Sequence, residues 1–200
     1  MKWESITKED LKIENDEVLV VSCMYQLRRV ADEMADMSCP RDKVLKLIRD
    51  IKPRVFVHGI VNGTYNRPFF TTRFKEVVSK LFSFFDMLDS NLPRDSEARL
   101  HLESCHVIPM IANIVACEGS ERVERPETYK QWQARNLRAG FGQLPIDLKI
   151  KKKIRNFVRE LYHKEFLVDE DKNWLLLGWK GVVFLGLSTW IPNDHDCLTS

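Results

Sequence analysis

Short catalytic and metal-binding patterns are missing from this sequence. It contains no CxxC pair, no GxSxG, no P-loop and no HxxxH spacing among its five histidines. These absences leave a zinc ribbon, an α/β-hydrolase nucleophile, a P-loop and a zinc-protease helix without support. Apolar runs of transmembrane length are also absent, so we expect no membrane span. Residues 1–17 lack the apolar core of a signal peptide, so we expect no signal peptide there.

Cysteine is sparse and net charge is small. The five cysteines are odd in number and widely spaced, which favours free thiols in a reducing compartment over a disulfide framework. Lys and Arg total 31 against 29 Asp and Glu, a net charge of +2. This balance argues against a surface that is basic over the whole chain, but it permits a local basic patch. An apolar fraction of 44 % is typical of a globular chain.

A strand–helix–strand pattern is the first clear indication of secondary structure along the chain, over residues 17–61. Residues 17–23 (EVLVVSC) and 54–61 (RVFVHGIV) are short apolar runs, typical of strands buried on both faces of a parallel sheet. Between them, residues 40–53 carry apolar side chains at helical spacing, with Pro40 suited to the first helical turn. Residues 26–37 predict a further helix. We therefore expect a βαβ unit.

Helices are predicted through the middle of the chain. A Phe-rich stripe at helical spacing over residues 70–88 predicts a long helix with that stripe in the core. Residues 96–108 also predict a helix, which Pro109 should end or kink. Residues 112–117 fit either a helix end or a strand. Residues 147–163 predict another helix, whose inward side chains would be Ile150, Ile154, Phe157, Val158 and Leu161.

The C-terminal tail predicts a β-hairpin. Two apolar runs between residues 173 and 190 are separated by Trp179-Lys180-Gly181. About four strands result, fewer than an ordinary sheet has, so we expect these strands to form part of a larger sheet. The sole GxG, residues 140–142, does not join a strand to a helix in a βαβ unit. It therefore predicts a turn and not a dinucleotide-binding loop.

Two features leave alternatives open. His58, within the second apolar run, fits a hydrogen-bonded core or pocket-edge histidine better than a metal ligand. The run KIKKKIR fits a solvated helix face, a phosphate-contacting surface or a nuclear-import signal. Its basic residues are Lys149, Lys151, Lys152, Lys153 and Arg155.

Residues 116–141 are unusually dense in alternating charge. Arginine forks that match carboxylates favour a buried or half-buried ion-pair cluster here, and no paired carboxylates in a cleft support catalysis. We predict that Arg122, Glu124 and Arg125 act structurally and tie this loop to the rest of the fold. Pro126 fits the first position of the helix that follows.

That helix should end at a glycine. Tyr129, Trp132 and Leu137 are predicted to point inward, and Gly140 to terminate the helix.

Several of these segments resemble the C-terminal part of GRAS-family transcription regulators from plants, with the Scarecrow-like branch the best match. The resemblance covers essentially the whole chain. It implies structural or interaction roles for the matched positions. These are Arg122, Glu124 and Arg125 in the RVER element, Trp132, Gly140, Trp179, Ser188 and Trp190 in the SAW motif, and Pro53, Arg99 and Glu103 in the PFYRE motif.

The sequence departs from the family pattern in places. The first leucine-rich region and the VHIID motif have no counterpart, and CHVIP at residues 105–109 is less polar than in relatives. The resemblance therefore implies a partial GRAS domain over residues 1–200. Its divisions would be the end of the second leucine-rich region with the PFYRE-like part (1–110), the RVER and SAW-like part (111–192) and a tail (193–200).

The family fold is similar to that of S-adenosylmethionine-dependent methyltransferases. The resemblance implies an α/β fold, namely the C-terminal part of a Rossmann-like sheet with flanking helices and a closing antiparallel hairpin. The runs at 17–23 and 54–61 would be the fourth and fifth strands, and the hairpin the sixth and seventh. In that fold the cofactor-binding loop follows the first strand. None of the four strands matched in this sequence corresponds to that first strand. The resemblance thus implies no cofactor and no enzyme.

The function implied is that of a nuclear transcription regulator. Its expected partners are transcription factors or other regulators, other GRAS proteins as homo- or heterodimers, and DNA, with no membrane. The alternative is a catalytically inactive methyltransferase-like module that binds a small molecule. Pull-down of transcription factors would favour the first hypothesis, and saturable ligand binding the second.

Overall fold

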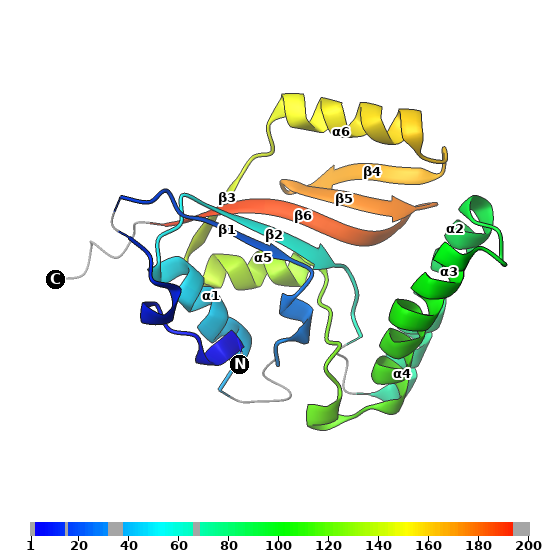
Figure 1. Ribbon diagram of the computed structural model, residues 1–200, viewed down its shortest axis with the longest axis horizontal. Coiled ribbons are helices and arrows are strands. Elements are labelled where there is room, and N and C mark those ends of the chain that lie inside the picture. The colour runs from blue at the N-terminus through cyan, green and yellow to red at the C-terminus, as the bar shows by residue number, and fades with distance from the viewer. Residues whose placement is uncertain (1–2, 15, 32–37, 66–68, 194–200) are drawn as a thin grey trace.

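A mixed sheet forms the centre of the molecule (Figure 1). The computed structural model describes residues 3–14, 16–31, 38–65 and 69–193. The strand order is β1-β2-β6-β5-β4, and β3 also pairs with β6. β1 (Val20–Met24) and β2 (Val55–Val61) are parallel and are joined through α1 (Pro40–Asp50), which confirms the βαβ unit. The other pairings of the described sheet are antiparallel.

The predicted hairpin is confirmed and occupies the middle of the sheet. β5 (Trp174–Trp179) and β6 (Val182–Pro192) are joined by Lys180 and Gly181, which have φ values of 45° and 84°. Two positive φ values characterise the type I′ turn that suits a twisted hairpin. The last strand, β6, lies between β2 and β5 and runs antiparallel to both.

The described residues form six strands, so the expectation of about four was too low. β4 (Phe166–Asp171) ends in three acidic residues and therefore lacks a continuous apolar run. β3 (Phe141–Leu144) begins inside the GxG segment, and Phe141 pairs with Pro192. The prediction of a simple turn there was wrong, because four residues suffice to add a strand beside the long β6.

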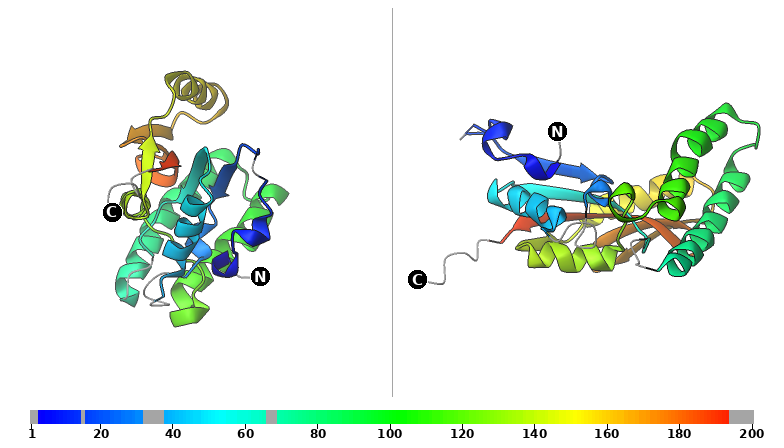
Figure 2. Two further views of the ribbon diagram at one scale, coloured as in Figure 1. Left: turned by 90° about the vertical axis from the view of Figure 1, so that its left-hand side faces the viewer. Right: turned by 90° about the horizontal axis from the view of Figure 1, so that it is seen from below.

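Two antiparallel helical runs form an arm at one end of the sheet (Figures 1 and 2). The first is α2 (Phe70–Asn91). The second runs through α3 (Glu97–Leu102), a π-helical turn (Glu103–Val107) and α4 (Ile108–Ala116).

Pro109 does not end this second run. It lies in the first turn of α4, where a missing N–H is tolerated, and the π turn precedes it. The Phe-rich stripe of α2 is only partly core: Val77 and Leu88 are buried, whereas Phe74 is 45 % exposed. α2 packs against α4 and β5, and the side chains of the stripe that lie outside these contacts stay exposed to solvent.

α5 (Tyr129–Arg138) and α6 (Leu148–Leu161) both differ from the prediction in detail. α5 is capped by Thr128, so Pro126 precedes the helix and does not start it. Leu137 is exposed, contrary to the prediction.

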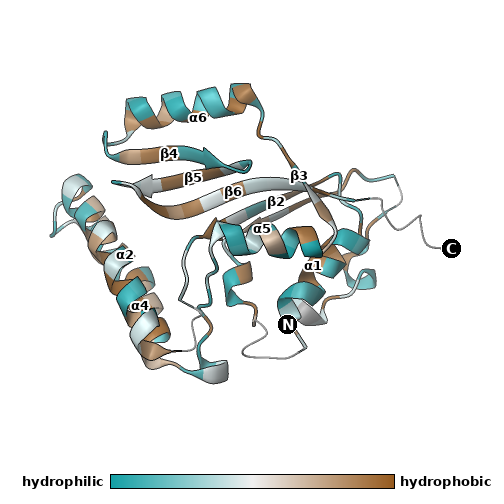
Figure 3. Cartoon of the chain, turned by 180° about the vertical axis from the view of Figure 1, so that it is seen from behind, coloured by the Kyte–Doolittle hydropathy of each residue, from teal (hydrophilic) through white to brown (hydrophobic). Residues whose placement is uncertain are grey.

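α6 lies along β4 and has no fully buried residue (Figure 1). Of the side chains predicted to point inward, Ile154 and Val158 are half-buried, so the prediction holds only in part. Hydrophobic and hydrophilic residues alternate along this helix (Figure 3). Ile150, Phe157 and Leu161 are each more than half exposed. Ile150 and Ile154 line an open pocket of about 340 Å³ with Leu175 of β5 and Leu187 of β6, so a gap separates this face of α6 from the sheet.

The main core lies between the sheet and the pair α1 and α5. It joins Leu45 of α1, Trp132 of α5 and Phe56 of β2 with Trp174 and Trp190 of the hairpin. β1 is less buried than predicted, because it is an edge strand of the described sheet and Val20 is 55 % exposed. Of the helix predicted over residues 26–37, the structure shows a 3-10 turn, η3 (Leu27–Arg29); residues 32–37 lie outside the described part.

Candidate functional site

The segment that links the helical arm to α5 buries four charged side chains. Arg122, Glu124, Arg125 and Glu127 are between 2 % and 7 % exposed. Charged side chains are seldom buried without partners, because desolvation disfavours them. Their contacts therefore define what this segment does.

Glu127 is shared by two buried arginines. Its Oε1 lies 3.0 Å from Arg41 Nη1 and 2.9 Å from Arg135 Nη2, and Arg135 Nε donates to Oε2 at 3.2 Å. Arg135 also donates to Asp42 at 2.7 Å. Burial of Asp42 opposes its ionisation, but bonds from the Cys39 thiol and from Arg135 outweigh burial and lower its pKa. The carboxylate of Glu127 thus joins Arg41 of α1 to Arg135 of α5.

The same two guanidinium groups lie over the ring of Trp132. Their central carbons are 5.3 Å (Arg41) and 5.8 Å (Arg135) from the ring centroid. A guanidinium within about 6 Å of an indole face is attracted to it. Trp132 is therefore a core residue, 1 % exposed, within this ion-pair cluster.

Arg122 and Arg125 bond to backbone carbonyl groups. Arg122 Nη1 donates to the carbonyl oxygen of Tyr65 at 3.2 Å. Arg125 donates from Nε to the Arg122 carbonyl at 2.9 Å and from Nη2 to the Gly119 carbonyl. Its own carbonyl accepts from Arg41 Nη2 at 2.6 Å. These bonds hold the segment in its path across the fold.

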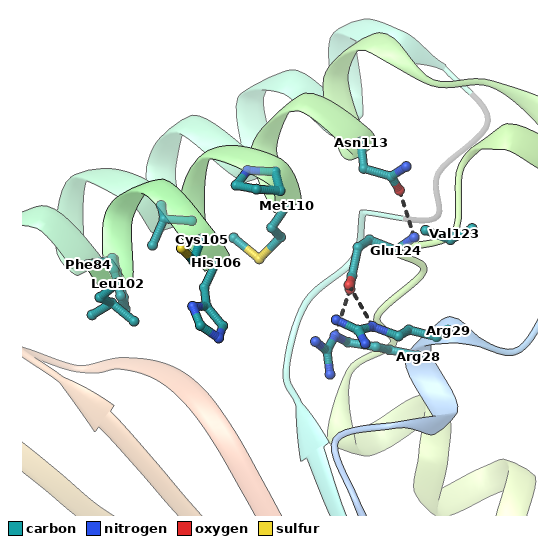
Figure 4. A pocket seen from close by; sticks show the side chains of 12 residues that line it. Arg28, Arg29, Phe84, Leu102, Cys105, His106, Met110, Asn113, Val123 and Glu124 are labelled. Atoms are coloured by element: carbon teal, nitrogen blue, oxygen red, sulfur yellow. Dashed lines mark hydrogen bonds and ion pairs between the residues drawn. The ribbon is translucent and has the colours of Figure 1, made fainter. Parts of the chain in front are cut away.

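Glu124 ties the arm to the 3-10 turn η3 (Figure 4). Its carboxylate accepts from Arg28 Nε at 2.6 Å and from Arg29 Nε at 3.1 Å. Its backbone N–H donates to Asn113 Oδ1 of α4 at 2.7 Å. The RVER element thus contacts four separate parts of the chain, namely α1, the loop after β2, η3 and α4.

Ser188 and Trp190 of β6 lie close to His58 in the sheet. Trp190 Nε1 donates to Ser188 Oγ at 2.7 Å, and Ser188 pairs with His58 across β6 and β2. His58 is fully buried, and its Nδ1 lies 3.1 Å from Asn136 Nδ2. Burial, reinforced by the charge of Arg41, lowers the pKa of His58 to about 3, so the ring is neutral at pH 7. His58 is thus a hydrogen-bonded core residue, as expected.

Three further matched positions, Trp179, Arg99 and Glu103, make contacts with or within the helical arm. Trp179 is buried, and its Nε1 donates to Asp86 of α2 at 2.5 Å. Arg99 donates to Glu103 at 2.7 Å, within the second helical run, and lies 2.7 Å from Asp89 of α2. The RE pair therefore holds the two helical runs together.

The remaining positions are separate from this cluster. Pro53 is buried just before β2, and Gly140 has a φ of 86° after α5, where a Cβ would approach Arg49 to 3.1 Å. On α6, Lys151 donates to Glu170 of β4 at 2.6 Å. The other basic residues of the run are exposed: Lys149, Lys152, Lys153 and Arg155.

Sequence reasoning missed Arg41, Arg135 and the shared role of Glu127. Arg135 follows Trp132 by three residues and so lies on the same face of α5, which is a usable signal. Arg41 gives no such signal, because its partner Glu127 is far away in the sequence. No cluster of three side chains suited to a metal occurs in the part of the chain that the structure describes.

Comparison with known proteins identifies the family. The GRAS domain family model matches residues 1–191. This chain belongs to the GRAS domain family. The GRAS chain is 51 % identical over 192 residues to Scarecrow-like protein 33 of Arabidopsis thaliana, covering 96 % of the chain and 28 % of that protein. It is 49 % identical to Scarecrow-like protein 14 of the same plant, covering 96 % of the chain and 25 % of that protein.

A solved GRAS structure has the same fold. The crystal structure of SCL7 from Oryza sativa superposes with a TM-score of 0.83 at 26 % identity. The match covers 92 % of this GRAS chain and 51 % of the rice chain. The chain thus spans about half of that solved structure, and about a quarter of the length of the curated relatives named above. Within the described residues, every helix is too short or too polar to span a bilayer.

Proposed function

We propose that this GRAS chain is part of a plant transcription regulator that acts in the nucleus through protein contacts and without enzymatic activity. The family match with Scarecrow-like relatives carries the proposal. The matched motif residues support it, because Arg122, Glu124, Arg125 and Trp132 are buried and bond within the fold. Such residues build a scaffold and leave recognition to exposed surfaces.

α6 is the surface that we assign to partner contacts. Lys152 and Lys153 are exposed on this helix, as are the apolar side chains of Ile150 and Phe157. A helix that presents both kinds of side chain suits an acidic, partly apolar partner, in keeping with interface composition. The same lysines could contact DNA phosphates.

The test is a reporter assay in plant cells with the chain tethered to the promoter. We expect reporter output to change, and the double variant Lys152→Glu/Lys153→Glu to abolish the change. Lys43→Glu/Lys46→Glu on α1 is the matched control, since these lysines are also exposed. An unchanged reporter with the wild-type chain, or equal effects of the two double variants, would contradict the proposal.

The absence of enzymatic activity is tested separately by calorimetry with S-adenosylmethionine. We expect no saturable heat of binding. A one-to-one isotherm in the micromolar range would show cofactor binding and contradict this part of the proposal.

A further inference from the structure

A cleft of about 690 Å³ separates the helical arm from the 3-10 turn η3 (Figure 4). Ligand pockets usually measure about 300–1,000 Å³ and are mostly apolar with a few polar groups. The walls of this cleft follow that composition. The apolar side chains are Phe84, Leu102, Val107, Pro109, Met110 and Val123.

The polar end of the cleft has more positive than negative charge. Arg28 and Arg29 share the single carboxylate of Glu124. The Arg29 side chain is 56 % exposed and bonds through Nε alone, so both of its Nη groups are without partners among the described residues. A guanidinium with open Nη donors is suited to bind a carboxylate through two parallel hydrogen bonds.

The opposite wall comes from the π-helical turn. This turn places Cys105, His106 and Val107 along the cleft. π turns inside helices occur frequently at functional sites. The apolar surface therefore lies between two polar ends, Arg29 on one wall and the exposed His106 imidazole on the other.

We propose that this cleft binds a small apolar carboxylic acid. Its carboxylate would contact the Nη groups of Arg29, and its hydrocarbon body would pack against Met110 and Phe84. The charge excess at Arg29 selects an anion, and the apolar walls select a ligand with a hydrocarbon body. The site goes beyond the proposed regulatory role and does not depend on it.

Octanoate and its uncharged counterpart octanol are the probes, titrated into the 200-residue chain and followed by ligand-observed NMR. We expect octanoate to bind at least about tenfold more tightly than octanol, the ratio that 1.4 kcal/mol of charge-assisted bonding gives. Arg29→Gln should remove that preference and leave octanol binding unchanged. Arg159→Gln, an exposed arginine on α6, is the matched control and should keep it.

A second variant tests the position of the site. Val123 is 51 % exposed at the cleft, so Val123→Trp should fold and should block both probes. Equal affinities of the wild-type chain for the two probes would overturn the proposal. So would a preference that survives Arg29→Gln, or octanoate binding that survives Val123→Trp.

Discussion

Substitution of Glu127 should destabilise the fold strongly, because its single carboxylate is the ion-pair partner of two buried guanidinium groups, those of Arg41 and Arg135. Glu127→Ala leaves Arg41 and Arg135 buried with less compensation. Breaking a buried ion pair on one side costs about 3–5 kcal/mol, so the free energy of unfolding in urea should fall by about that amount. Glu121→Ala, at an exposed position, should change it by less than about 0.5 kcal/mol. Similar midpoints for the two variants would show that Glu127 is not a structural centre.

Lys80 predicts a pH dependence of stability. Its Nζ contacts the carbonyl oxygens of Asn62 and, at 3.1 Å, Val183. Burial lowers its pKa from 10.5 to about 8, partly offset by Glu76. The folded chain therefore loses this proton before the unfolded chain does.

The free energy of unfolding should consequently rise between pH 8 and 10.5, by at most about 3 kcal/mol. Below pH 8, Lys80 is protonated in both states and should add no pH dependence. Urea titrations across this range measure the slope. Lys80→Met should reduce the slope, whereas Lys75→Met, at an exposed position of the same helix, should keep it. A slope that Lys80→Met leaves intact would assign the dependence to other groups.

Residue-level prediction from sequence succeeded where the clue was local. His58 lies within an apolar run, and that run was enough to predict a hydrogen-bonded core or pocket-edge histidine, which the structure shows to be in the core. The bond between Arg41 and Glu127 joins α1 to a loop 86 positions away, and no local pattern encodes it. Long-range ion pairs of this kind depend on tertiary packing.

At the scale of elements, the start of α5 depends on a reciprocal cap. The Gln131 backbone N–H donates to Thr128 Oγ1 at 3.3 Å, and the Thr128 backbone N–H donates to Gln131 Oε1 at 2.9 Å. Thr128→Ala should lower the free energy of unfolding by about 0.5–2 kcal/mol. Chemical denaturation measures it, with the exposed Thr71→Ala of α2 as the control. A loss no larger than the control's would mean that packing alone fixes the helix start.

The elements that sequence predicted well have patterns that fit their surroundings. The βαβ unit and the β5–β6 hairpin have continuous apolar runs and clear turn residues. β4 was missed because its acidic end lies at the edge of the sheet, where apolar residues are not required. α6 has a helical apolar stripe that the fold only partly buries, so periodicity predicted the helix but not its environment.

At the scale of the whole molecule, a few polar contacts join the helical arm to the sheet. Trp179 and Lys180 of the hairpin both donate hydrogen bonds to Asp86 of α2. The bond from Lys180, and then that from Trp179, lower the pKa of Asp86. Glu124 and Asn113 supply a second connection on the other side of the arm. The cleft lies where the arm and η3 diverge, so its width depends on these contacts.

β1 forms one edge of the described sheet. β1 has one strand neighbour, β2, within the described residues, and Val18 and Val20 are 68 % and 55 % exposed. An exposed apolar edge offers unpaired backbone groups to another chain. We therefore expect the isolated chain to self-associate through β1 or to fold incompletely.

Val20→Lys should shift the isolated chain toward monomer, because a charge on an edge strand opposes pairing. Sedimentation velocity over a range of concentrations measures the shift. Val123→Lys is the control, since Val123 is similarly exposed, at 51 %, but lies away from the edge. A wild-type chain that stays monomeric, melts cooperatively and protects the β1 amides from hydrogen exchange would show that the sheet is complete without a further strand.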